Sequence, residues 1–255
     1  MRNQINIFGY LVREEVYDAS SQNCYAFRHG YDVKDGVVLA LGNMVSGFGF
    51  DLQGIHFNNS ECAYIAGAFS DGSIKHRALQ GELVNCTNGF LAKKSIRKPN
   101  DAIKRADWEE FNVMWMLYVV WMKCLGNGDF RKLLLSLPSD AVIIEDSTFQ
   151  TGRTATVWGT KNLEMKKRLN LYKKELKAQG FNKAAIKRTQ DEKRLGEWGK
   201  IGRFVGKNVM GKILMLCRDA LLNDCEPCID YALLKSMHID LLGNKLSFNQ
   251  YIEAA

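Results

Sequence analysis

One segment, WEEFNVMWMLYVVWMKC at 108–124, constrains the fold more than any other part of the chain. Its apolar side chains occupy nearly every face of a helix, so other parts of the protein must cover that helix on both sides. Asp107 precedes it as a possible N-cap, and a Gly-Asn-Gly run at 126–128 ends it. The segment therefore predicts a central helix. Its Lys123 either extends its ammonium group to water or, if buried, needs a carboxylate partner.

The rest of the chain alternates short strands with helices. Apolar or β-branched runs predict strands at 4–12, 36–41 and 141–146, and a shorter one at 48–52. Helices are expected at roughly 61–69, 100–105, 129–137 and 209–222, and a helix and a short strand should follow residue 229. Ser60 is the expected N-cap of the first of them. We therefore expect an α+β, helix-dominated single domain over 1–255 with a small sheet.

Several observations limit the class of protein. No apolar run reaches the roughly 20 residues of a membrane helix, and the start, MRNQINIFGYLVREE, lacks the apolar core of a signal peptide. Seven cysteines at scattered positions favour reduced thiols in a cytoplasmic compartment. Cys225 and Cys228 form a CxxC pair without a second pair or nearby histidines, so two separate thiols are favoured over a zinc site. We expect no metal and no cofactor.

The positive charge is concentrated in one segment. Residues 161–207 contain 15 Lys or Arg and 5 Asp or Glu, a net charge of +10, so the remainder of this +7 chain carries −3. Met165, Leu169, Tyr172 and Leu176 follow one another at helical offsets, and Gly180 separates a second basic helix at 182–195. A basic helical hairpin at about 161–200 is therefore expected.

A face so rich in lysine and arginine suits a nucleic-acid backbone, although a solvated hairpin that merely keeps the protein soluble would show the same pattern. The candidate nucleic-acid contacts are Lys166, Lys167, Arg168, Lys173, Lys174, Lys187 and Arg188. Few aromatic residues lie among them, so we expect contacts to phosphates more than to bases.

Two carboxylates are candidates for chemistry. Glu61 opens a helix, where the helix dipole alone favours an acidic residue. Glu145 ends the strand at 141–146, shortly before Trp158-Gly159. A carboxylate beside an indole would suit acid–base chemistry on a stacked ring, but a surface acidic residue and a core tryptophan explain the same pattern.

The segment GKNVMGKILMLCR, 206–218, combines a glycine-rich turn with a helix start. Asn208 is a good N-cap, and Gly206 and Gly211 allow another group to approach the backbone closely. Free N–H groups at such a helix start suit a phosphate, to which Lys207 or Lys212 would add charge. Alternatively, Gly211 serves only a contact between helices.

The order of these features along the chain is more informative than any one of them. Its members are Asn43 and Phe48, Glu61 at a helix start, Trp108 with Met116 and Lys123, Glu145 before Trp158-Gly159, and then 206–218. The pattern resembles the NADAR, or YbiA-like, family, which shows a helix-start glutamate, W…M……K, an acidic strand end, WG and G-x-N-x-x-G-K-x-L-M-x-x-R. The resemblance covers roughly 40–222. The basic hairpin lies where the family usually has a short connection, which indicates an insertion.

The resemblance implies a compact, mostly helical α+β domain with N-glycosidase chemistry. Some members remove ADP-ribose from guanine in nucleic acid as antitoxin partners of ADP-ribosylating toxins, so a cognate toxin is a possible partner. Others split early intermediates of the riboflavin pathway. Breaking a ribose–base bond builds positive charge on the sugar, which requires a carboxylate, a proton donor and cations for any phosphates.

On this resemblance the catalytic residues are Glu61, Lys123 and Glu145. Either carboxylate would orient water or stabilise the sugar cation. Lys123 would act as a donor, or as a nucleophile on the opened sugar if burial lowers its pKa. The substrate would be held by Asn43, Phe48, Trp108, Trp158, Gly159, Asn208, Gly211 and Arg218.

The chain departs from the family at two positions. Gln150 lies near the place of a family aspartate, and Ala68 stands where the family often has lysine. These departures favour a non-catalytic sensor of ADP-ribose or NAD. The retained Glu61, Lys123 and Glu145 favour an enzyme, acting either on modified nucleic acid or on a small nucleotide.

Overall fold

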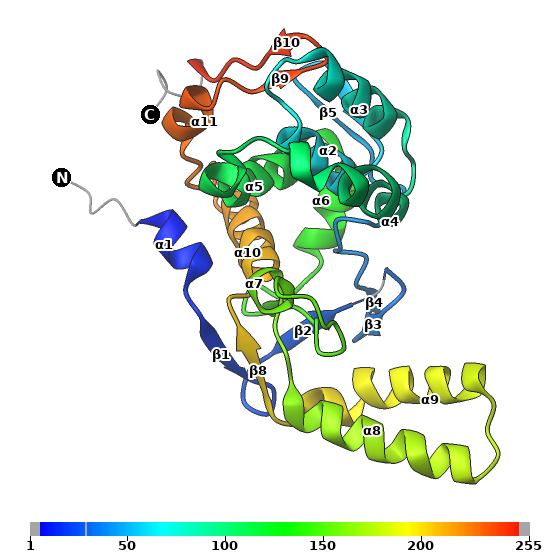
Figure 1. Ribbon diagram of the computed structural model, residues 1–255. Helices are drawn as coiled ribbons and strands as arrows, with labels where there is room; N and C mark the ends of the chain where they lie inside the picture. Colours follow the sequence, from blue (N-terminus) through cyan, green and yellow to red (C-terminus); the bar gives the residue numbers. More distant parts are fainter. Residues whose placement is uncertain (1–5, 29, 250–255) are drawn as a thin grey trace. The chain divides into compact units, whose positions relative to one another are not determined.

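The structure, a computed structural model, describes residues 6–28 and 30–249 (Figure 1). Contacts between residues divide the chain into two compact units. The first unit comprises Met1–Gly42 and Ser136–Met215, and the second comprises Asn43–Leu135 and Leu216–Ala255. Helices dominate, and the strands of the described residues pair only two by two. The expected helix-dominated α+β class is confirmed, while the single domain over 1–255 stays a prediction.

The second unit is built around α5, Trp108–Gly126, which is buried along most of its length and so confirms the expected central helix. α2, Ser60–Ala68, packs along it. Gly67 makes this close approach possible, because a Cβ there would collide with the ring of Trp115. The Trp115 Nε1 donates to the carbonyl of Ala63 at 3.2 Å, so one side chain both fills the space and ties the two helices.

Shorter elements surround this pair of helices in the second unit. They are β5 (Phe50–Leu52), β6 (Ile55–Phe57), α3 (Ile74–Asn85), α4 (Gly89–Leu91), the π-helix η1 (Ala92–Arg97), the 3-10 helix η2 (Lys98–Ile103), α6 (Gly128–Leu135), α11 (Tyr231–Ser236), β9 (Asp240–Leu241) and β10 (Asn244–Lys245). β5 and β6 form an antiparallel hairpin, as do β9 and β10.

The first unit contains two strand pairs made from distant parts of the chain. β1, Glu15–Asp18, pairs antiparallel with β8, Arg203–Gly206. β2, Cys24–Phe27, pairs parallel with β7, Val142–Glu145, and places Phe27 opposite Glu145. The remaining elements are α1 (Ile7–Val12), β3 (Val33–Lys34), β4 (Val37–Val38), α7 (Ala155–Trp158), α8 (Leu163–Ala178), α9 (Lys183–Leu195), the 3-10 helix η3 (Glu197–Lys200) and most of α10 (Val209–Leu222).

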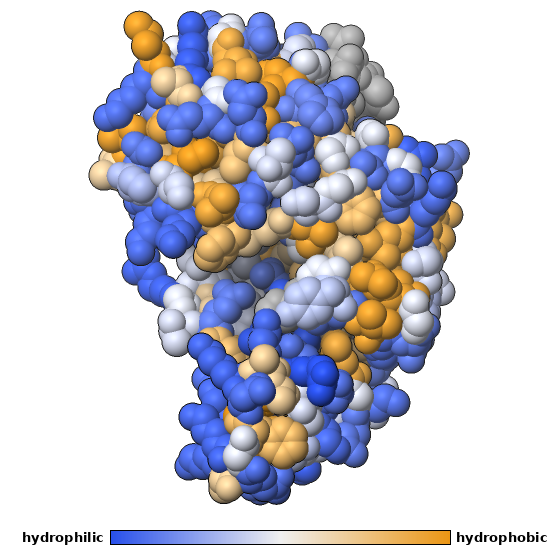
Figure 2. Space-filling view, turned by 90° about the vertical axis from the view of Figure 1, so that its right-hand side faces the viewer, coloured by the Kyte–Doolittle hydropathy of each residue, from blue (hydrophilic) through white to orange (hydrophobic). Residues whose placement is uncertain are grey.

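The expected basic hairpin is present as α8 and α9, which run antiparallel (Figure 1). Asn162 caps α8 by accepting from the Met165 N–H, and Asn182 caps α9 in the same way. Met165 and Leu169 are buried with Phe204 of β8, so the predicted apolar stripe attaches the hairpin to the first unit. In Figure 2 the hairpin, the lowest part of the view, is covered mainly by hydrophilic side chains.

Some local predictions were wrong. The expected strand at 4–12 is the helix α1 over Ile7–Val12, because the Asn6 side chain caps it by accepting from Gly9 N–H at 2.8 Å; residues 4 and 5 lie outside the described part. The strand expected at 36–41 pairs only over Val37–Val38. Asn59, not Ser60, caps α2, since its Oδ1 accepts from Cys62 N–H at 3.0 Å.

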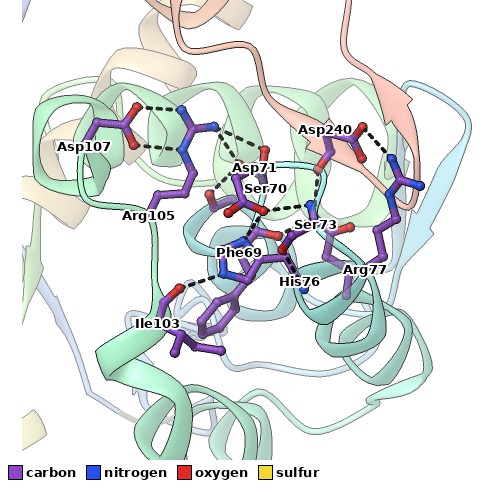
Figure 3. Close-up of polar contacts among 12 residues, drawn as sticks. Phe69, Ser70, Asp71, Ser73, His76, Arg77, Ile103, Arg105, Asp107 and Asp240 are labelled. Atoms are coloured by element: carbon purple, nitrogen blue, oxygen red, sulfur yellow. Dashed lines mark hydrogen bonds and ion pairs between the residues drawn. The ribbon is translucent and has the colours of Figure 1, made fainter.

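Asp107 stands at the start of α5 but makes no side-chain cap. Its carboxylate instead forms two bonds to Arg105, at 2.8 and 2.6 Å (Figure 3). In the same cluster the buried His76 ring places Nδ1 2.7 Å from an Asp71 oxygen and Nε2 2.7 Å from the Ile103 carbonyl. The cluster holds the segment before α5 against α3, so it fixes where the central helix begins.

Two kinds of feature are absent from residues 6–28 and 30–249. No helix there is both long and apolar enough to cross a membrane. No group of three or more His, Cys, Asp or Glu side chains there is arranged to hold a metal ion. The seven cysteines are free thiols, and Cys225 and Cys228 are exposed.

Candidate active site

Lys123 is the most unusual charged residue of the second unit. Its side chain is buried, and its Nζ lies 3.6 Å from the centre of the Phe130 ring and 5.2 Å from that of Phe48. No carboxylate among the described residues lies within ion-pair distance of this amine. Burial therefore lowers the pKa of Lys123 to about 7. A buried lysine is expected to pair with a carboxylate, whereas Lys123 is surrounded by two aromatic rings.

Glu61 is the second buried ionisable group of this unit. It lies in the first turn of α2 and is only 5% exposed. Burial raises the pKa of its carboxyl group, and the nearby cations Lys93 and Arg97 of η1 partly oppose that rise. A helix-start glutamate that served only the helix dipole would be expected at the surface, so the dipole does not account for this burial.

Three buried polar atoms of residues at or bonded to the start of α2 have no hydrogen-bond partner among the described residues. They are Asn43 Oδ1, Asn59 Nδ2 and Ser60 Oγ. Buried polar atoms are normally paired, so three such atoms near one helix start indicate a place where a ligand or water completes the bonding. The sequence pointed to Asn43 and to Ser60 as a cap, but nothing in it showed that these atoms would remain unpaired.

Backbone contacts hold these groups around Glu61. The Glu61 N–H donates to the Asn43 carbonyl at 3.1 Å. Gly89 packs so closely that a Cβ there would lie 2.8 Å from Met44 Cα and 3.1 Å from Glu61 Cβ. Asn43 Nδ2 in turn lies 3.3 Å from the sulfur of Met116 in α5. The start of α2 is therefore connected to the face of α5 that carries Met116.

Met116 and Lys123 are separated by two helical turns, so they share that face and lie about 10 Å apart along α5. Glu61 and Lys123 are therefore linked only indirectly, through Asn43 and Met116, and no ion pair joins them among the described residues.

Two other predicted residues of the second unit are buried. Trp108 is fully buried, with Tyr64 at 4.9 Å and Phe111 at 5.2 Å between ring centres. These neighbours pack against the Trp108 ring as side chains do in a hydrophobic core. Arg218 is 3% exposed and binds Asp219 Oδ1 through Nε and an Nη, each at 3.2 Å. Stacking by Trp108 and substrate contact by Arg218 stay predictions.

The Gly-x-Asn-x-x-Gly motif lies in the first unit and serves the end of β7. Asn208 is fully buried; its Oδ1 accepts from Glu145 N–H at 3.0 Å and its Nδ2 donates to the Ile143 carbonyl at 2.8 Å. A Cβ at Gly211 would collide with the same Ile143 carbonyl. The motif therefore holds α10 against β7 and positions Glu145, a half-buried residue at the strand end. Substrate contact by Asn208 and Gly211 stays a prediction.

The Trp-Gly pair belongs to the same arrangement. A Cβ at Gly159 would lie 2.6 Å from the Glu145 carbonyl and from Ser147 Oγ, so only glycine fits beside β7. Trp158 ends α7 and is half-buried. Gly206 has φ of +155° and passes so close to the Gly159 carbonyl that a Cβ would lie 2.6 Å from it. These glycines thus have packing roles, and their predicted contacts with substrate remain untested.

Lys212 is one of the two cations within α10, the other being Arg218. It is fully buried, and its Nζ donates to the carbonyls of Tyr10 at 3.0 Å and Arg13 at 2.8 Å, with Glu15 at 3.5 Å. Burial lowers the pKa of Lys212, while Glu15 acts in the opposite direction. The amine closes the end of α1 and is used inside the protein, not on a phosphate.

The remaining predicted positions lie at the surface or inside α2. Of the seven hairpin residues, Lys166 is half-buried and the others are exposed, with Arg168 paired to Glu164 at 3.5 Å and Arg188 to Glu192 at 3.9 Å. Gln150 is exposed, and Ala68 is fully buried. A lysine at 68 would have to fit into a packed helix end, which accounts physically for alanine there.

Comparisons with known proteins found similarity among solved structures only. No family model matches the chain, and no curated protein matches it. The chain is similar to the NMR structure of the E. coli protein YbiA, with 19% sequence identity, 80% of this chain and 88% of that chain covered, and a TM-score of 0.47.

Proposed function

We propose that this chain is an N-glycosidase that hydrolyses a ribose–base bond, with ADP-ribosylated guanine in nucleic acid as its substrate. One observation carries the proposal: the amine of Lys123 is buried, lacks a carboxylate partner among the described residues and has a pKa lowered to about 7. Near neutral pH a large fraction of such an amine is uncharged and nucleophilic. The sequence resemblance supplies the reaction class in which the amine would act.

The proposed chemistry needs only water as a co-reactant. When the ribose ring opens at C1′, the base stays attached through a C=N bond. The Lys123 amine adds to C1′, the amino group of the base leaves with a proton, and an imine then joins the lysine to the sugar. Water adds to that imine, releases the sugar aldehyde and regenerates the amine.

Glu61 is the proposed proton carrier. Because burial raises its pKa, it holds a proton at a higher pH than an exposed glutamate would, and it can give that proton to the departing base. As a carboxylate it can then take a proton from the attacking water. Asn43 Oδ1, Asn59 Nδ2 and Ser60 Oγ would complete their hydrogen bonding on ribose hydroxyls. Glu145 remains the second candidate carboxylate.

The basic hairpin supports nucleic acid over a free nucleotide as the carrier of the modified base. Of its predicted contacts, Lys167, Lys173 and Lys174 are exposed and have no carboxylate partner among the described residues. Phosphates would displace their counterions, so binding should weaken steeply as salt concentration rises.

The test is incubation with DNA that carries ADP-ribosylated guanine, with and without cyanoborohydride. Without the reductant, we expect released ADP-ribose by chromatography. With it, the imine is reduced, and mass spectrometry of peptides should find ADP-ribose on Lys123. Lys123→Arg should abolish both signals, because a guanidinium stays protonated and cannot form the imine. Lys132→Arg is the matched control, since Lys132 is an exposed lysine of the same unit.

Other outcomes identify the alternatives. Release that Lys123→Arg leaves unchanged would refute the lysine route and leave Glu61 or Glu145 to activate water directly. Tight binding of ADP-ribose without release would make the chain a sensor, as the alanine at 68 and the glutamine at 150 would suggest. Release from a free nucleotide but not from DNA would leave the glycosidase chemistry standing and remove the nucleic-acid substrate.

A further inference from the structure

A second basic surface lies in the second unit, on the segment that begins at α4 (Figure 1) and continues through η1 into η2. No acidic residue occurs at 83–100, and this interval contains four cations: Lys93, Lys94, Arg97 and Lys98. The three lysines are exposed, and none of them has a carboxylate partner among the described residues. The segment therefore concentrates positive charge at the surface of the second unit.

The fold turns one side of this segment inward. Ala92 is fully buried and Ile96 is 7% exposed, and these two residues, four apart, anchor the segment. Phe90, Lys94 and Lys98 also follow one another at intervals of four, and all three are exposed. Because residues four apart lie next to one another on a helix, an aromatic ring and two lysines share the outer face.

Phe90 is the unusual member of this face. The residue is 58% exposed and makes no ring contact with another described residue. Asn88 Oδ1 accepts from the N–H of Phe90 at 3.0 Å and from that of Leu91 at 3.1 Å, so the backbone that carries the ring is held in place. An exposed ring on a fixed backbone offers its face to a flat ligand.

The outer face adjoins the candidate carboxylate. Gly89, directly before Phe90, packs so closely against α2 that a Cβ there would lie 3.1 Å from Glu61 Cβ. The charges of Lys93 and Arg97 act on the Glu61 carboxyl group and partly offset the effect of burial on its pKa. η1 is also a π-helix, a rare conformation that is frequent at functional sites. A ligand on Phe90 would therefore be bound close to the start of α2.

We propose that this outer face binds single-stranded nucleic acid, with one base stacked on Phe90 and phosphates contacting Lys94 and Lys98. Aromatic rings combined with cations are the means by which proteins hold single strands, since every base has a face that can stack. In a duplex those faces are covered by neighbouring base pairs, so the ring of Phe90 could not stack on them. The inference rests on the proposed function, because it names the form of nucleic acid that would present a modified guanine near Glu61.

The experiment measures binding by fluorescence anisotropy, with a labelled single strand of mixed sequence and with the duplex that it forms with its complement. The DNA is unmodified, so no turnover is needed. We expect Phe90→Ala to weaken binding of the single strand at least fivefold and to leave binding of the duplex within about twofold. Phe90→Tyr keeps a ring and should bind the single strand as the wild type does.

Leu91→Ala is the matched control for the ring. Leu91 is 50% exposed beside Phe90, but an aliphatic side chain cannot stack on a base, so this variant should bind both DNAs as the wild type does. A lipid surface would instead take up both apolar side chains, and vesicles that contain phosphatidylserine provide that comparison.

The two lysines are tested through salt. Lys94→Ala with Lys98→Ala should lower the slope of log affinity against log salt by up to about 1.4 for the single strand, since each phosphate contact contributes roughly 0.7. Lys132→Ala with Lys235→Ala removes the same charge from exposed positions of the same unit outside this segment, and it should leave the slope unchanged. All these side chains are exposed, so every variant should keep the melting temperature of the wild type.

Three results would overturn the inference: no binding of the single strand, equal effects of Phe90→Ala and Leu91→Ala, or equal slopes for the two lysine pairs. Vesicle binding that needs both Phe90 and Leu91, without binding of the single strand, would assign the face to a membrane. Release of ADP-ribose together with any of these results would refute this surface alone and leave the proposed glycosidase standing. Single-strand binding as expected, without release, would refute the glycosidase and leave the surface standing.

Discussion

Lys123 in the second unit and Arg194 in the first are both almost completely excluded from water, yet their surroundings differ. Arg194 is met by three carboxylates, whereas Lys123 is met by two phenylalanine rings. The carboxylates stabilise the charge of Arg194 and raise its pKa. The surroundings of Lys123 lower its pKa to about 7, so the amine loses its charge near neutral pH. A buried cation with its partners is thus structural, and one without them is a candidate for chemistry.

The largest expected effect is the dependence of the free energy of unfolding on pH that Lys123 causes. The pKa of Lys123 is about 7 in the folded protein and 10.5 for an ordinary lysine, so between these values the unfolded state binds more protons. The free energy of unfolding should therefore rise with pH over this window, by roughly 4–5 kcal/mol in total. Below pH 7 both states are protonated, and the destabilisation is at its greatest.

Urea denaturation of the wild type and of Lys123→Met across pH 6.5–10.5 checks this expectation. The variant lacks the titrating amine, so it should be more stable than the wild type at the lower end, and the two should converge as pH rises. The difference between them cancels the contributions of thiols and phenols. A constant difference at every pH would mean that the amine reaches water, and the contrast with Arg194 would fail.

The next effect tests the partnered cation. Arg194→Met leaves Asp32 and Asp146 buried without their cation, which should reduce the free energy of unfolding by about 3–5 kcal/mol. Arg188→Met is the matched control, because Arg188 lies on the same helix and is exposed, with only a 3.9 Å contact to Glu192. That change should stay within about 0.5 kcal/mol. Chemical denaturation measures both, and equal losses would show that Arg194 is not a structural anchor.

A smaller loss of stability is expected at Gly211, and it tests whether this glycine is needed for packing. Gly211→Ala places a Cβ against the Ile143 carbonyl and within 2.5 Å of the Asn208 amide, so it should destabilise the protein by about 1–3 kcal/mol. Gly81→Ala, in α3, meets nothing within 4 Å and should stabilise it by roughly 0.5–1 kcal/mol. Thermal denaturation of the two variants measures both changes in stability. A stable Gly211→Ala protein would show that this glycine is not needed for packing.

The smallest effect concerns the exposed cations of the hairpin. Lys167→Ala with Lys174→Ala should leave the melting temperature unchanged, because both side chains are exposed. If the hairpin contacts phosphates, the same pair should lower the slope of log affinity against log salt by up to about two for duplex DNA. Fluorescence anisotropy at several salt concentrations measures that slope. An unchanged slope would leave these lysines as solubilising residues.

Patterns that depend on residues close together in the chain were read correctly from the sequence. The apolar helix α5 and the basic helices α8 and α9 lie close to their expected bounds. β7 at Val142–Glu145 and α10 at Val209–Leu222 also agree. The strand expected at 4–12 is instead a helix over Ile7–Val12. A short apolar run does not distinguish a helix from a strand, and the Asn6 side chain caps the helix.

The candidate site was predicted only in part, for a different physical reason. The sequence pointed to Glu61 and Lys123 through motif order, but it carried no sign that Phe130 would lie over the amine or that Asn59 Nδ2 would stay unpaired. Likewise Asn208, an expected cap, is engaged by β7, more than sixty residues away in the chain.

The positions of helices are set largely by neighbours within a few residues, so the amino-acid sequence predicts them, although it did not identify the caps of α2 and α5. A pKa, a cavity or an unpaired atom depends on which distant groups exclude water and which supply hydrogen bonds. Lys123 and Arg194 are equally basic in the sequence. Their pKa values differ in the folded protein because two aromatic rings lie against Lys123 and three carboxylates lie against Arg194. Among these neighbours Phe48, Asp32 and Asp146 come from distant parts of the chain, so only the tertiary structure determines those contacts.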